Sequence, residues 1–224
     1  MRRKLDERLD QERSRRGYGL TQALSPEEMQ ELLSTIPGHL QQEETKLRLA
    51  AEAFVGSCPV RVGDVVSFPT WQMHSLQHGV RVIEFQTPHY ERMIVMFGQK
   101  VLTQDHWNTE EALAGMKPEV YQPPQPELIW QRDGVCCERV VNFPDFDAFR
   151  LSIPAGKRIR LEEKGNYQLL MGVEGYGQLL VGGESCGTVR HEEGWMIPAV
   201  TDDCWLESRG AGDLICLQAI PKSS

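Results

Sequence analysis

The sequence predicts a mainly β protein with an α-helical N-terminal segment, an incomplete first β-barrel and a complete C-terminal jelly roll. Three observations predict this fold class. The apolar residues change from a helical to an extended pattern near Pro59. A Pro-rich stretch follows at 117–126, and beyond it nearly every segment is a short apolar run bounded by Gly, Pro, Asn or Asp. The predicted segments are 1–57 (helical), 58–116 (partial barrel with a short helix), 117–126 (linker) and 127–224 (jelly roll).

The N-terminal segment carries clear helix signals. Ser25-Pro26-Glu27-Glu28 combines a Ser cap, a Pro at the first helical position and a Glu three residues after the cap. The helix that starts there is predicted to stop at Pro37-Gly38, and a further amphipathic helix is expected over 43–54. Residues 1–16 are polar apart from a few apolar positions, so a helix there needs a partner to be stable.

The partial barrel is predicted from two apolar segments, 60–68 and 80–85. Each is rich in Val, Ile or Phe, and turn signals stand at Gly63-Asp64 and His78-Gly79. Asn108-Thr109-Glu110-Glu111 is a start signal for a short helix.

The linker and the jelly roll complete the predicted architecture. Three crowded Pro residues in the linker cannot join a sheet ladder. Nine short strands are predicted after it: 135–141, 148–153, 157–161, 167–173, 178–181, 188–191, 194–197, 204–207 and 214–219.

Composition excludes several classes of partner. The net charge of −8 argues against a nucleic-acid surface. No apolar run approaches the roughly 20 residues that span a bilayer, and no apolar stretch follows the basic N-terminal residues as in a signal peptide. The six Cys residues show neither zinc-ribbon nor redox spacing, which favours a reducing, cytoplasmic location.

One motif carries the chemistry. Gly63 opens an expected strand, Pro69 closes it, and a tight corner then presents His74. This spacing resembles the second signature of the cupin superfamily, whose fold is a jelly roll or double-stranded β-helix, with Trp71 where that pattern usually has Gly. The wider stretch 65–86 is similar to the type I phosphomannose isomerase family, which has Pro-Ala-Gly-Thr-Val-His-Ala-Leu followed by a strand ending Glu-hydrophobe-Gln.

Further stretches agree with that family over roughly 58–220. Gln99-Lys100-Val101 stands where the family has Gly-Arg-Val, and 105–113 resembles its step from a His into a helix. In the C-terminal part, Glu193-Gly194-Trp195-Met196-Ile197-Pro198-Ala199 looks like its closing Gly-x-x-x-Ile-Pro-Ala, one residue shorter.

The resemblance implies a mannose-6-phosphate isomerase, an intramolecular oxidoreductase that uses zinc to interconvert mannose 6-phosphate and fructose 6-phosphate. It implies His74 as a metal ligand and Lys100 in place of the catalytic Arg, without that residue's planar fork. Arg92, two residues after Tyr90 on the same expected strand, is a candidate contact for the phosphate. The family's other zinc ligands, a Gln, a His and a Glu, have no counterpart upstream of residue 58.

Alternatives stay open at this point. His74 is either a metal ligand or a His at the core or rim of the barrel; His78, Glu84, His89 and His106 are further candidates for the metal. The competing function is a non-catalytic cupin that binds a sugar phosphate or a partner chain. A separate chain that supplies the missing barrel strands, or a homo-oligomer, is the expected macromolecular partner. The only His of the C-terminal barrel, His191, is assigned no metal.

Overall fold

The computed structural model describes residues 2–20, 22–76, 79–87, 93, 95, 108–119, 121–162 and 165–222. The described residues up to Val62 belong to one compact unit and those from Gly63 onward to a second. Each unit is treated by itself below. Among the described residues, no helix has both the length and the apolar character that a membrane crossing requires.

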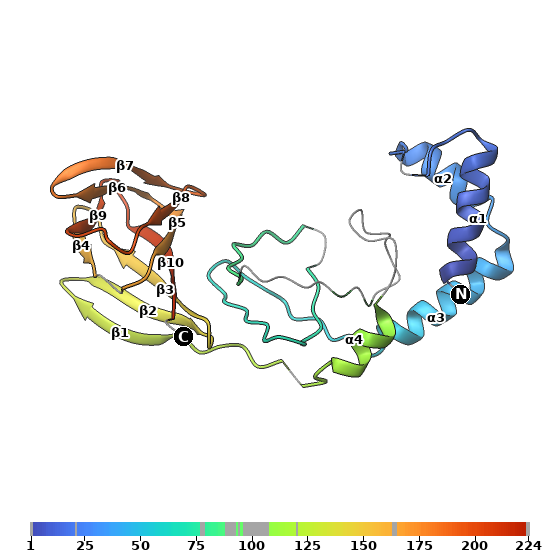
Figure 1. Cartoon of the computed structure of the whole chain (residues 1–224), viewed down its shortest axis with the longest axis horizontal. Coiled ribbons are helices and arrows are strands. Elements are labelled where there is room, and N and C mark those ends of the chain that lie inside the picture. The colour runs from blue at the N-terminus through green and yellow to red at the C-terminus, as the bar shows by residue number, and fades with distance from the viewer. Residues whose placement is uncertain are drawn as a thin grey trace. The chain divides into compact units, whose positions relative to one another are not determined.

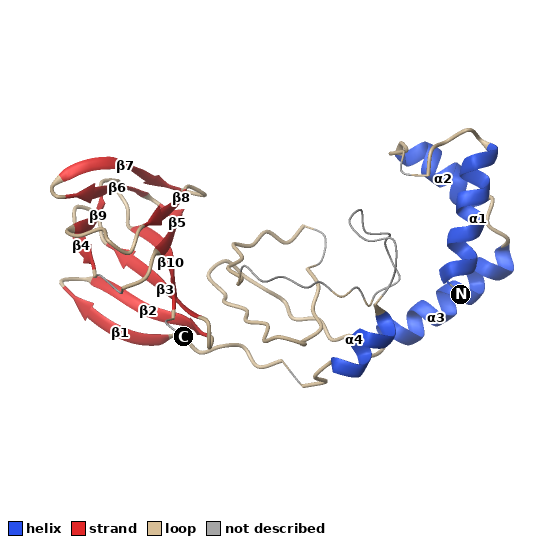
Figure 2. Cartoon of the chain, in the orientation of Figure 1, coloured by secondary structure: helices blue, strands red, loops and turns tan. Residues whose placement is uncertain are grey.

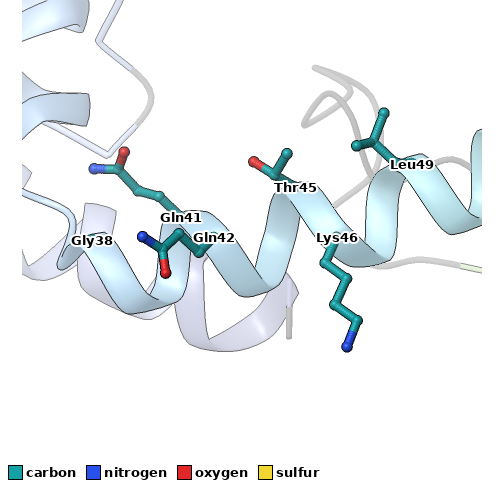
Figure 3. A pocket seen from close by; sticks show the side chains of 6 residues that line it. All are labelled: Gly38, Gln41, Gln42, Thr45, Lys46 and Leu49. Carbon is teal, nitrogen blue, oxygen red and sulfur yellow. The ribbon is translucent and has the colours of Figure 1, made fainter.

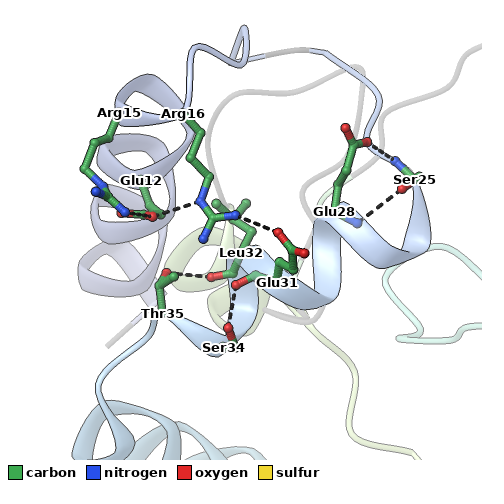
Figure 4. Close-up of polar contacts among 9 residues, drawn as sticks. All are labelled: Glu12, Arg15, Arg16, Ser25, Glu28, Glu31, Leu32, Ser34 and Thr35. Atoms are coloured by element: carbon green, nitrogen blue, oxygen red, sulfur yellow. Dashed lines mark hydrogen bonds and ion pairs between the residues drawn. The ribbon is translucent and has the colours of Figure 1, made fainter.

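Three helices make up the first unit: α1 (Arg2–Arg15), α2 (Pro26–Ser34) and α3 (Gly38–Glu52). The predicted capping box is confirmed at α2. The Glu28 amide donates to Ser25 Oγ (3.2 Å), and the Ser25 amide donates to the Glu28 carboxylate (2.7 Å), as Figure 4 shows. Two N–H groups at the helix start are thereby satisfied, which explains why α2 begins where the sequence predicts.

The helix α3 begins earlier than predicted, at Gly38 rather than near residue 43. Pro37 ends the preceding segment and occupies the N-cap position of α3, with φ −54° and ψ 134°. The Pro-Gly pair therefore separates two helices directly, because the fixed φ of proline suits a helix start as well as a break.

The helices α1 and α2 share a network of ion pairs. Glu12 accepts from Arg15 (2.7 Å) and from Arg16 (2.9 Å), and Arg16 reaches Glu31 of α2 at 3.1 Å. Figure 4 shows these contacts side by side. Leu5 of α1 and Leu32 of α2 are both buried, so α2 is the partner that the polar α1 needs.

Acid should weaken this network selectively. The hydrogen bond from Arg15, followed by that from Arg16, lowers the pKa of Glu12 from 4.5 to about 2. A folded-state pKa below the unfolded value means that the stabilisation is present above pH 4.5 and is lost as the pH falls through about 2. We expect circular dichroism at 222 nm to show a loss of helix over this range that is smaller in Glu12→Gln. Superimposable acid titrations of the two proteins would contradict the role given to Glu12.

The second unit begins with a segment that forms no strand. The extended pieces predicted at 60–68 and 80–85 are present as non-helical chain, but none of the described residues in 57–87 belongs to a β-ladder (Figure 2). The prediction of strands here is wrong because a strand exists only when neighbouring strands satisfy its N–H and C=O groups. The predicted turn at Gly63 is confirmed, with φ +92°, and so is the short helix, α4 (Thr109–Gly115).

Two antiparallel sheets complete the second unit (Figure 1). The six-stranded sheet has the order β1-β2-β3-β10-β5-β8 and the four-stranded sheet the order β4-β9-β6-β7. The strands are β1 (Glu127–Arg132), β2 (Val135–Asn142), β3 (Phe146–Ile153), β4 (Arg158–Leu161), β5 (Gln168–Glu174), β6 (Tyr176–Val181), β7 (Glu184–Arg190), β8 (Gly194–Ile197), β9 (Cys204–Ser208) and β10 (Leu214–Pro221).

The pairing of strands follows one rule. Within β3–β10 the first strand pairs with the last, β4 with β9, β5 with β8, and β6 with β7, all antiparallel. The eight strands are therefore one long antiparallel ribbon that is wound so that successive segments enter alternate sheets. This is the jelly roll, or double-stranded β-helix, and the predicted fold class is confirmed.

All nine strands predicted for the jelly roll are present, and one further strand, β1, was not predicted. The strand β1 lies at the sheet edge and is mostly exposed, so it lacks an apolar alternation. Its signal is the turn: Asp133 and Gly134 both have positive φ (50° and 83°) and join Arg132 to Val135 in a two-residue hairpin loop. An Asp-Gly pair is the residue choice that such a turn favours.

A single apolar core fills the sandwich between its sheets. In strands such as β9 and β5, alternate residues are buried between the sheets. The buried cluster consists of Val135, Cys137, Leu151, Ile153, Ile159, Leu161, Leu170, Leu179, Val189, Ile197, Cys204, Leu206, Leu214 and Cys216.

Two glutamines interrupt this core. Gln218 of β10 donates to the side chain of Gln168 in β5, and the Gln168 amide donates to the Glu162 carbonyl (2.8 Å). Both glutamines are buried, so each amide depends on its protein partner rather than on water.

Removing both members of this pair should lower the stability by less than the sum of the two single removals. We expect Gln218→Leu to lower the free energy of unfolding by about 1–3 kcal/mol, because the Gln168 carbonyl loses its donor. The double variant Gln168→Leu/Gln218→Leu should lose less than the sum of the single variants. Urea unfolding followed by Trp fluorescence measures this, since all five Trp lie beyond residue 70. Gln131→Leu on the exposed edge strand is the control; additive losses would contradict the pairing.

Candidate functional site

The corner before His74 is a tight turn over residues 69–72. The Gln72 amide donates to the Pro69 carbonyl at 3.1 Å. Trp71, the third residue of the turn, has φ +71°, whereas Thr70 is not among the described residues with positive φ. A positive φ at the third residue alone defines a type II turn, which favours Gly at this position. Trp71 therefore adopts a backbone conformation that favours Gly, the residue that the resembled pattern has at this position.

The imidazole of His74 is fixed by two contacts. Its Nδ1 lies 2.9 Å from the Gln72 carbonyl, and its ring stacks on Phe68 with a centroid distance of 4.1 Å and an interplanar angle of 6°. Since a carbonyl only accepts hydrogen bonds, Nδ1 is the donor in this contact, and in the neutral ring Nε2 is the nitrogen with the lone pair. This arrangement resembles the way a ligating His is oriented through its second ring nitrogen.

The surroundings of His74 differ from those predicted. The sequence places this ring on the inner wall of a barrel, but the side chain is exposed, as are Met73, Ser75 and Leu76. The prediction of an inward-facing imidazole is wrong because the described part of 57–87 forms no barrel wall. Phe68 is the residue that shields one face of the ring, and Tyr121 lies behind it at 5.9 Å.

The described residues do not assemble a metal centre around His74. Among them, no three His, Cys, Asp or Glu side chains gather closely enough to hold an ion. A catalytic zinc site takes three protein ligands and one open position. His74 supplies one donor of the right kind, so the described residues by themselves do not fit zinc, and we derive no chemical step through it. Glu84, a further candidate, is exposed.

The remaining predicted site residues cannot be placed. Lys100 and Arg92, expected to contact the substrate, lie outside the described residues, as do His78, His89 and His106. Their roles stay predictions.

Among the described residues of the sandwich, the two most deeply perturbed thiols, Cys204 and Cys216, are not candidates for a reactive site. Burial raises the pKa of Cys216 to about 12 and, with Cys186 and Asp203 as lesser causes, that of Cys204 to about 11, which makes both thiols poor nucleophiles. His191, the histidine of the sandwich, is exposed, with Nδ1 2.6 Å from the Val173 carbonyl.

A shallow hollow lies along α3 in the first unit. Figure 3 shows the residues that line it: Gly38, Gln41, Gln42, Thr45, Lys46 and Leu49. All six come from one helix, so no second wall brings further polar groups toward a ligand. Binding sites are concave and convergent, and this hollow is not a candidate.

Two polar contacts join the segment around His74 to the sandwich, and neither was predicted. Arg150 of β3 donates to the Gly63 carbonyl at 3.1 Å, and Arg81 pairs with Glu192. Such pairs have no periodic signature in the sequence, because their partners are far apart along the chain.

Comparison with known proteins gives fold-level likeness only. No protein-family profile and no curated protein sequence matches the chain. Solved structures similar to it include the cupin domain of Cnp3 from Schizosaccharomyces pombe, with 13% identity over 41% of this chain and 67% of that one, at a TM-score of 0.37. An RmlC-like cupin from Shewanella frigidimarina has 14% identity over 45% of this chain and 85% of that one, at a TM-score of 0.37.

The mannose 6-phosphate isomerase of Bacillus subtilis is similar at 15% identity over 51% of this chain, with a TM-score of 0.43. The match spans 34% of that enzyme. These similarities are too low to assign an activity. The class of the protein rests on its own strand order: its C-terminal part is a jelly roll.

Proposed function

We propose that this protein is a sugar-phosphate isomerase-like cupin in which His74 contributes one position of a zinc site through Nε2. The observation that carries this proposal is the 2.9 Å contact between Nδ1 and the Gln72 carbonyl. This contact leaves Nε2 as the nitrogen available to bind a metal. The residues that resemble the phosphomannose isomerase family support mannose 6-phosphate and fructose 6-phosphate as the substrate pair. Lys100 and Arg92 are the proposed contacts to sugar oxygens and phosphate.

Such a site needs ligands besides His74. In this proposal they come from residues outside the described part of the chain or from a second chain that supplies barrel strands. Exposed apolar side chains near the corner, among them Met73, Leu76 and Val82, support an association of this kind.

The second candidate is a non-catalytic cupin that binds a sugar phosphate or a partner chain. The observation that favours it is the combination of an exposed His74 with the lack of a three-ligand group among the described residues. Both candidates share the fold and differ in whether metal and turnover depend on His74.

Zinc content and isomerase turnover of the full chain test the first candidate. We expect His74→Ala to weaken zinc binding by more than about 100-fold, because loss of an outer partner of a ligand already costs 10–100-fold, and to abolish formation of fructose 6-phosphate. The matched control is His191→Ala, which removes another exposed histidine whose Nδ1 faces a carbonyl.

The outcomes separate the candidates. Zinc and turnover that both depend on His74 support the isomerase. Zinc held through His74 without turnover selects the non-catalytic protein. Zinc binding that His74→Ala leaves unchanged, or no zinc at all, overturns the metal site.

A further inference from the structure

We propose that α4 clamps the turn that presents His74, and that Trp71 and Gly115 are the positioning residues of this clamp. The inference deepens the proposed function, since it concerns the same imidazole, and it rests on that function only for what His74 binds. The geometry of the clamp is independent of any metal.

The turn carries strain that something must offset. Trp71 has φ +71° at the position that a type II turn reserves for Gly. A residue with a Cβ is strained in the left-handed region, because its Cβ comes too close to the following carbonyl oxygen. Such a conformation persists only where the surrounding structure enforces it, and it is common at functional sites.

Contacts from α4 and the residue beyond its C-cap enforce it. The Lys117 amide donates to the Trp71 carbonyl at 3.0 Å. The indole lies so close to Gly115 that a Cβ added there would stand 2.6 Å from Cζ3 and 2.7 Å from Cε3. Gly115 is not among the residues with positive φ, so its own backbone does not require glycine. The Trp71 ring does, because a side chain at 115 would occupy the ring's place.

The clamp reaches His74 through the next residue. The conformation of Trp71 sets the direction of the Gln72 amide, which closes the turn on Pro69, and of the Gln72 carbonyl, which holds His74 Nδ1. Displacing the indole therefore opens the turn, moves the Gln72 carbonyl and frees the imidazole from its stack on Phe68. Trp71 and Gly115 act on His74 through this chain of contacts.

NMR of the metal-free full chain tests the clamp. The ring current of Phe68 shifts the Cε1 proton of His74 upfield, and the spectrum of His74→Ala assigns that signal among the six histidines. We expect Gly115→Ala to abolish the upfield shift. The control is Gly56→Ala, whose added Cβ meets no atom within 4 Å. Ala is a better helix former than Gly, so a weaker α4 cannot explain the loss.

A second pair of variants isolates the contact between ring and glycine. In a Trp71→Gly background, where the turn keeps a residue suited to positive φ but loses the indole, adding Gly115→Ala should cause no further change in the His74 signal. A His74 signal that keeps its upfield shift in Gly115→Ala overturns the clamp. So does an equal effect of Gly115→Ala with and without the indole. Because no zinc is present, neither result depends on whether His74 binds metal.

Discussion

The pairing of β3 with β10 is the constraint on which the jelly roll depends. Ile153 lies opposite Leu214 and Phe146 opposite Pro221, so the first and last strands of the ribbon align over their whole length. This contact brings together residues that are 61 to 75 positions apart and places β10 between β3 and β5. Every other pair of the ribbon is nested inside it, and the apolar core forms only when both sheets face each other. The buried Gln168–Gln218 pair then fixes the register of β5 against β10 from within.

The candidate site depends on a different kind of order. No described residue around His74 belongs to a β-ladder, yet the imidazole has a defined orientation. A type II turn, a stack on Phe68 and contacts with α4 are sufficient to hold it. Short-range hydrogen bonds and one aromatic stack thus hold the corner, although the described residues around it form no barrel wall.

Sequence reasoning succeeded where the signal is local. The Ser25–Glu28 capping box and the nine strands with their turns depend on neighbouring residues, and both were predicted. It failed at 60–68 and 80–85, where apolar residues of the right kind lack strands to pair with, because β-pairing is non-local. The turn at the corner could be predicted from its motif, but the contact between Trp71 and Gly115 could not. These two residues are 44 positions apart, and the sequence around either one gives no sign of a contact with the other.

Hydrogen exchange of backbone amides, read residue by residue, tests the account most directly. The central claim is that, among the described residues, sheet structure is confined to 127–221 and the His74 corner stands outside any ladder. The account predicts slow exchange for the inner strands β3, β5, β9 and β10, and fast exchange across 60–68 and 80–85. In the turn between those two segments, the Gln72 amide should be protected, because it donates to the Pro69 carbonyl. Slow exchange in an alternating pattern along both of those segments would show a formed barrel wall and contradict it.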